Sequence, residues 1–69
     1  MTNAIQEAVN HLEDYKRRLG RNFDKAKKHD DRVRYFNLYN ECENCIQMLS
    51  QKYHLTRKYR PYKLSLEVL

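Results

Sequence analysis

The residues Lys28-His29-Asp30-Asp31 (KHDD) separate two long segments of helical periodicity, and they decide the fold that the sequence predicts. The two aspartates can cap a second helix and favour its N-terminus electrostatically. A short connection around His29 forces the second helix to run back along the first. We therefore expect an all-α protein built on an antiparallel helical hairpin.

Upstream of this break, apolar side chains recur with the spacing of one helical face. Asn3 and Gln6 resemble a capping box, which predicts a helix start near Ala4. With successive residues placed about 100° apart, the apolar positions form one stripe centred on Leu12. The sequence predicts a helix over about residues 4–28, with these residues on its stripe: Ile5, Ala8, Val9, Leu12, Tyr15, Leu19, Phe23 and Ala26.

Gly20 leaves two interpretations of this helix open. The glycine follows three cations, residues 16–18, and could end the helix as a C-cap. The apolar stripe nevertheless stays in phase through Phe23. We expect one helix that crosses Gly20, although a glycine inside a helix costs ~1 kcal/mol.

The polar face of the first helix mixes many cations with fewer acids. A nucleic-acid-binding face is one interpretation of this pattern. We favour a solvated face with ordinary ion pairs between residues four apart, such as Glu13 with Arg17 and Asp14 with Arg18.

Downstream of the break, a second apolar pattern predicts a helix over about residues 31–54. Its arc is wider than one neighbouring helix can cover, so the helix needs another partner, either the C-terminal tail or a second copy of the chain. We expect a homodimer that forms a four-helix bundle. The residues expected in its core or dimer interface share this arc: Tyr35, Leu38, Tyr39, Cys42, Cys45, Ile46, Leu49 and Tyr53.

The length of the chain also favours association. A protein of 69 residues forms one small domain, with a core that usually needs a disulfide, a metal or a second subunit. We expect a hairpin domain over residues 1–55 and a docking segment over residues 56–69. The chain has no apolar run long enough for a membrane span and no secretory leader, so we expect no membrane contact and, by default, a cytoplasmic location.

Cys42 and Cys45 form the one motif that resembles a chemical site. A zinc ion needs four ligands, and the histidines at positions 11, 29 and 54 are scattered. A redox C-x-x-C motif normally follows a strand, and the chain predicts none before it. We therefore interpret both cysteines as small buried hydrophobic residues and expect no metal, no cofactor, no small-molecule substrate and no enzymatic activity.

The segment Thr56–Lys63 (TRKYRPYK) leads from the second helix into an apolar end. Pro61 requires that helix to stop before it, near His54 or Leu55. Beyond the proline, alternating apolar residues favour an extended segment, and a short third helix that starts at Pro61 is the alternative. Because two helices offer an extended backbone no strand edge to pair with, we expect this segment to pair with a second copy or with the sheet edge of a target.

The C-terminal third carries most of the net charge. Residues 44–69 hold five Lys or Arg against one acid, whereas residues 1–43 hold nine against eight. We expect a non-enzymatic regulatory or adaptor protein that self-associates and binds a protein with an acidic surface. The alternative is a nucleic-acid-binding protein that uses the tyrosines and cations of this third. The expected partner-binding residues are Arg57, Lys58, Tyr59, Arg60, Tyr62, Lys63, Leu64, Leu66 and Val68.

Overall fold

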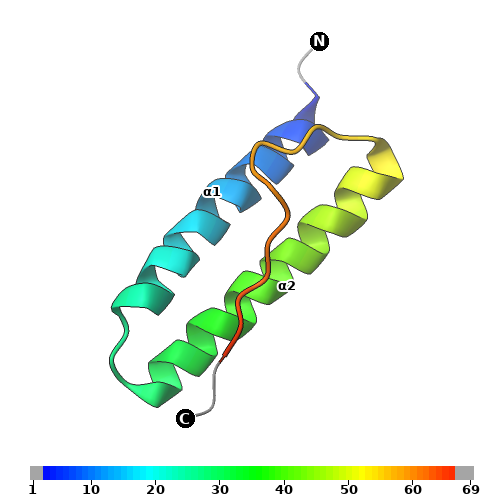
Figure 1. The fold of residues 1–69 in the computed structure, drawn as a ribbon. Coiled ribbons are helices and arrows are strands. Elements are labelled where there is room, and N and C mark those ends of the chain that lie inside the picture. Colours follow the sequence, from blue (N-terminus) through cyan, green and yellow to red (C-terminus); the bar gives the residue numbers. More distant parts are fainter. Residues whose placement is uncertain (1–2, 67–69) are drawn as a thin grey trace.

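Two antiparallel helices and a returning tail make up the structure, a computed structural model that describes residues 3–66 (Figure 1). Helices α1 (Ala4–Lys25) and α2 (His29–Tyr53) lie side by side. The chain then runs back along the hairpin without helix or strand as far as residue 66. The result is a rod of 47 × 17 × 16 Å. The predicted helical class and hairpin are confirmed.

Helix α1 begins where the capping signal predicts. The Asn3 side chain accepts hydrogen bonds from the backbone N–H groups of Ile5 and Gln6, at 3.0 and 3.3 Å. Gln6 does not complete a capping box, because its amide binds Thr56 of the tail. The local motif therefore supplies only the first half of the expected cap.

The turn between the helices differs from the expected one in its boundaries. Helix α1 ends at Lys25, three residues early, and Arg32 of α2 donates hydrogen bonds to the carbonyl groups of Phe23 and Ala26 at its end. Helix α2 begins at His29, with Lys28 at the N-cap and no side-chain hydrogen bond there. The prediction that the aspartates cap α2 is wrong. They lie in its first turn, where a negative charge interacts favourably with the helix dipole.

Gly20 lies inside α1, as expected, and the structure explains its presence. A Cβ atom at this position would lie 3.1 Å from Cε2 of Tyr39, closer than ordinary van der Waals contact. The glycine lets the Tyr39 ring of α2 approach the backbone of α1. The helix accepts a poor helix former here because the interhelical contact requires it.

The apolar core is small and lies along the line where the helices meet. It contains Val9, Leu19 and Phe23 from α1 with Tyr39 and Ile46 from α2. Of the other residues expected in the core or interface, Tyr35, Cys42 and Leu49 are half-buried, whereas Leu38, Cys45 and Tyr53 are exposed. The expectation that both thiols are buried is wrong for Cys45 within the single chain, because this side of α2 faces away from α1 and from the tail.

Helix α2 ends at Tyr53, within a residue or two of the predicted end. His54 adopts a left-handed conformation, with φ of 53°, and the N–H of Leu55 donates to the carbonyl group of Ser50. This left-handed residue turns the chain out of the helix. The tail starts from here and lies over the seam between the helices (Figure 1).

Two side-chain amides hold the tail backbone. Gln6 accepts from the N–H of Thr56 and donates to its carbonyl group, at 3.0 and 2.9 Å. Asn40 makes the same pair of bonds with Leu64, at 2.9 and 3.3 Å. The expectation that the helices offer the tail no backbone partner is wrong, because an amide side chain presents the same donor and acceptor as a strand edge.

The Asn40 amide should hold the end of the tail in place. Asn40→Ala removes both bonds to Leu64, at roughly 1 kcal/mol each. We expect faster hydrogen exchange at the Leu64 amide and little change in helical circular dichroism. Asn40→Asp keeps the acceptor and should protect the Leu64 amide more than alanine does, and Asn44→Ala, at an exposed position one turn further on, is the control. Equal exchange in all variants would contradict the role of the amide.

Candidate functional site

Four charged side chains meet between the hairpin and the tail, and we call them the ion cluster: Glu13 and Lys16 of α1, Glu43 of α2 and Arg57 of the tail. Glu13, Lys16 and Glu43 are 1%, 4% and 0% exposed, and the Arg57 side chain is 16% exposed. Charged groups at this depth are stable only when they are paired and hydrogen-bonded. The cluster is therefore a defining contact of the fold.

Arg57 is the centre of the ion cluster. Its guanidinium forms two parallel bonds to the Glu43 carboxylate, at 2.7 and 3.1 Å, and its Nε donates to Glu13 at 2.8 Å. Lys16 also donates to Glu43, and the backbone N–H of Lys58 donates to Glu13 at 2.6 Å. Two cations and two carboxylates thus balance, with both oxygens of each carboxylate bonded.

The cluster strongly stabilises the ionised form of Glu43. Burial alone raises the pKa of this carboxyl group, but hydrogen bonds from Arg57, Lys16 and Gln47 outweigh it and lower the pKa to about 2. The bond to Glu43 in turn raises the pKa of Arg57. Glu43 and Arg57 are therefore both charged at neutral pH.

The ion pairs of α1 differ from those that the sequence predicts. Glu13 pairs with Arg57 instead of Arg17, and Asp14 pairs with Lys58, at 3.1 Å, instead of Arg18. The expected solvated face of α1 is thus partly covered by the tail. The tail residues compete successfully for these acids because they bring backbone and side-chain donors together.

Sequence reasoning missed the ion cluster, although its spacing contains a signal. The line of α1 that faces α2 runs through Val9, Glu13, Lys16, Gly20 and Phe23, in alternating steps of four and three residues, and all of these but Gly20 are buried. Tyr39, Glu43 and Ile46 repeat the same steps on α2. Charged residues in register with an apolar seam of this spacing indicate a buried ion pair between helices.

The tail residues expected to bind a partner mostly contact their own hairpin. Arg57 enters the ion cluster, and Lys58 pairs with Asp14. The guanidinium of Arg17 stacks on the Tyr59 ring, with Cζ 4.5 Å from the ring centre. Tyr62 meets Tyr39 edge-on, with 6.4 Å between the ring centres. Of the other expected residues, Leu64 and Leu66 are half-buried, whereas Arg60 and Lys63 are exposed. Val68 lies outside the described residues.

The side of the hairpin that the tail leaves open carries a row of uncharged side chains, which we call the apolar face. Residues two apart on a helix point to nearly opposite sides. Leu38 and Cys42 are each two residues from Asn40, which binds the tail, so they point away from the tail. Tyr15 points away from it for the same reason, because it is two residues from Arg17, which stacks on Tyr59 of the tail. The apolar face comprises Ala8, Leu12, Tyr15, Leu38, Cys42, Cys45, Leu49 and Tyr53.

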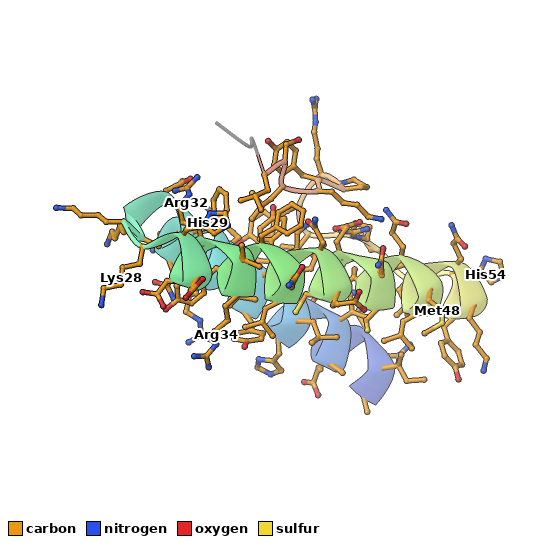
Figure 2. All side chains as sticks on the ribbon, turned by 90° about the horizontal axis from the view of Figure 1, so that it is seen from below. Lys28, His29, Arg32, Arg34, Met48 and His54 are labelled. Atoms are coloured by element: carbon orange, nitrogen blue, oxygen red, sulfur yellow. The ribbon has the colours of Figure 1, made fainter. Side chains whose placement is uncertain are left out.

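The apolar face is substantially open to solvent. Tyr15, Leu38 and Tyr53 are 39%, 36% and 43% exposed. Figure 2 shows the tail on one side of α2, with Arg34 and Met48 on the other. The strip itself is uncharged, and the exposed cations Arg34, one turn before Leu38, and Lys52, beside Tyr53, lie at its edge. An uncharged, partly exposed strip along two helices is typical of a surface that associates with another helix.

The cysteines of the apolar face show no sign of a reactive or metal site. Both thiols are free, and burial raises the pKa of Cys42, which lowers its thiolate fraction. Within residues 3–66, no three His, Cys, Asp or Glu side chains gather closely enough to hold a metal ion.

Comparison with protein-family models, with curated protein sequences and with solved structures finds no match to this chain. Neither helix in the described part combines the length and apolar character that crossing a bilayer requires.

The ion cluster should depend strongly on Arg57. Arg57→Ala leaves two buried carboxylates with one cation, and breaking a buried pair in this way costs about 3–5 kcal/mol. We expect a matching fall in the free energy of unfolding measured with urea. Arg57→Lys should lose less stability than Arg57→Ala, because an ammonium group keeps the charge. It should still be less stable than the wild type, because it cannot form the two parallel bonds of a guanidinium.

Arg60→Ala is the control for this experiment, since Arg60 is an exposed cation of the same tail. It should change the stability by less than about 0.5 kcal/mol. Equal effects of Arg57→Ala and Arg60→Ala would show that the cluster contributes no more than surface charge.

The stability of the protein should fall in acid through Glu43. The folded pKa of about 2 lies below the ordinary value of 4.5, so the stabilisation is complete above pH 4.5 and is lost as the pH falls toward 2. The loss over this window is on the order of 3 kcal/mol. Urea unfolding between pH 2 and 7 measures it.

Glu43→Gln should be less stable than the wild type at neutral pH, with a flatter profile in this acid window. Glu41→Gln, at an exposed position of the same helix, is the matched control. An unchanged acid profile in Glu43→Gln would assign the loss of stability to other groups.

Proposed function

We propose that this protein is a small non-enzymatic adaptor that self-associates through the apolar face, with two hairpins forming a four-helix bundle. The observation that carries the proposal is the uncharged strip along both helices on the side opposite the tail. The buried core of one chain is small, and a second subunit is a common source of additional burial for a chain of this size.

A second copy of the chain matches the chemistry of the apolar face. The chain has a net charge of +5, so two copies repel each other overall, most strongly where like charges meet. The apolar face avoids this repulsion, because its positions carry no charge. A two-fold axis through the strip would place like residues of both copies together, which suits a surface of leucine, tyrosine and cysteine side chains.

The ion cluster supports this arrangement, since it keeps the tail off the apolar face. Arg57 and the amides of Gln6 and Asn40 bind the tail to the other side of the hairpin. In a bundle of two hairpins, both tails then lie on the outside. Each outer surface remains open to a further partner, which is the property that an adaptor requires.

A charge on the apolar face should separate the subunits. Wild-type protein at micromolar concentration should sediment at twice the 8.5 kDa mass of the chain. Leu38→Glu buries an unpaired charge in each subunit of the bundle, and we expect the dissociation constant to rise at least about 100-fold. Because Leu38 is 36% exposed in the single chain, the variant should keep its helical circular dichroism.

Asn44→Glu introduces the same charge at an exposed position of α2 outside the apolar face, and it should remain dimeric. A wild-type protein that sediments only as a single chain would refute self-association. Dimeric Leu38→Glu would instead place the interface elsewhere.

A further inference from the structure

A basic groove runs between α1 and the tail, on a different side of α1 from the apolar face. It has a volume of about 420 Å³, and it is lined by His11, Asp14, Arg17, Arg18, Arg21 and Tyr59. Arg18 and Arg21 are exposed, and α1 and the docked tail form its two walls. The groove therefore exists because the tail is docked against the hairpin, through the ion cluster and through the amides of Gln6 and Asn40.

The positive charge of the basic groove is largely uncompensated. Asp14 is the one acid in its lining, and that carboxylate already binds Lys58 and the Tyr59 hydroxyl. Among residues 3–66, neither Arg18 nor Arg21 forms an ion pair with an acid, and Arg17 contacts the ring of Tyr59. Three arginines can thus receive an anionic ligand without first breaking a salt bridge.

Aromatic rings continue the basic groove along the tail. Arg60 lines an adjoining hollow together with Arg17 and Tyr59. Tyr62 follows, 60% exposed, with its ring edge-on to the ring of Tyr39. An extended ligand lying along the tail would meet arginine side chains and tyrosine rings in alternation.

We propose that the basic groove and Tyr62 bind single-stranded nucleic acid, with Arg17, Arg18 and Arg21 on phosphates and the Tyr62 ring stacked on a base. Cations beside aromatic rings are the combination that binds single strands without sequence preference. An acidic peptide would use the arginines but not the exposed ring. A membrane surface would need aliphatic side chains beside the cations, whereas the lining of the groove consists of charged residues, a histidine and a tyrosine.

Fluorescence anisotropy with a labelled single-stranded oligonucleotide tests the arginines across a range of salt concentrations. Each phosphate-binding cation contributes about 0.7 to the slope of log K against log salt for a single strand. Arg18→Ala/Arg21→Ala should therefore bind more weakly, with a slope smaller by about 1.4. Arg34→Ala/Lys52→Ala removes the same charge from exposed positions of α2 outside the groove and should leave the slope unchanged. Equal effects of the two double variants would overturn the assignment.

Tyr62 tests the stacking contact separately. Tyr62→Ala should weaken oligonucleotide binding between about fivefold and 150-fold, whereas Tyr62→Phe keeps the ring and should bind as the wild type does. Inorganic polyphosphate should bind all three proteins equally, because it has no bases. Tighter binding of polyglutamate than of the oligonucleotide to the wild type would overturn the proposal. So would a Tyr62→Ala variant that loses affinity for polyphosphate as much as for the oligonucleotide. Hydrogen exchange at Leu64 checks that the tail stays docked in each variant.

Discussion

The fold depends on the contact between the Arg57 guanidinium and the carboxylates of Glu13 and Glu43. Each helix contributes one acid to the seam, and without Arg57 only Lys16 would balance them. Buried carboxylates on facing helices would repel each other strongly at low effective dielectric. The hairpin and the tail are therefore parts of one unit, since the residue that completes the interior of the hairpin comes from the tail.

This requirement determines which side of the hairpin the tail covers. An apolar tail on an amphipathic hairpin would ordinarily be expected to cover the apolar side. Here the tail lies on the polar side, because Arg57 must reach the acids and because Gln6 and Asn40 satisfy its backbone there. The apolar face is left open as a consequence, and the tail and α1 together enclose the basic groove.

The two surfaces differ in chemistry and lie on different sides of the molecule. The apolar face is uncharged and suits association between copies of the chain, whereas the basic groove collects cations and suits an anionic ligand. No residue belongs to both surfaces, so the proposed association and the proposed ligand binding would use separate side chains, although Arg18 of the groove lies over the Tyr15 ring of the apolar face. Binding an extended ligand on two copies at once would also raise its overall affinity.

The sequence by itself determined the two helices, the hairpin and the end of α2 before Pro61. Each follows from a local signal, namely the apolar periodicity, the Asn3 cap, the short connection around His29 and the conformational limits that proline imposes. It also indicated that α2 has more apolar surface than one neighbour covers. The exact ends of the helices near the turn were not predicted, because Arg32 reaches back to the carbonyl groups of α1.

Only the tertiary structure decided which tail residue enters the buried ion cluster and where the tail runs. Glu13 looked like one of many surface acids, and its pairing with Arg57 joins residues 44 positions apart. Gln6 and Asn40 gave no sequence sign that their amides would bind the tail backbone 50 and 24 residues away. Such contacts depend on the rotation of each helix about its axis. That rotation is set by packing around Gly20, Tyr39 and the ion cluster, and periodicity along the chain leaves it undetermined.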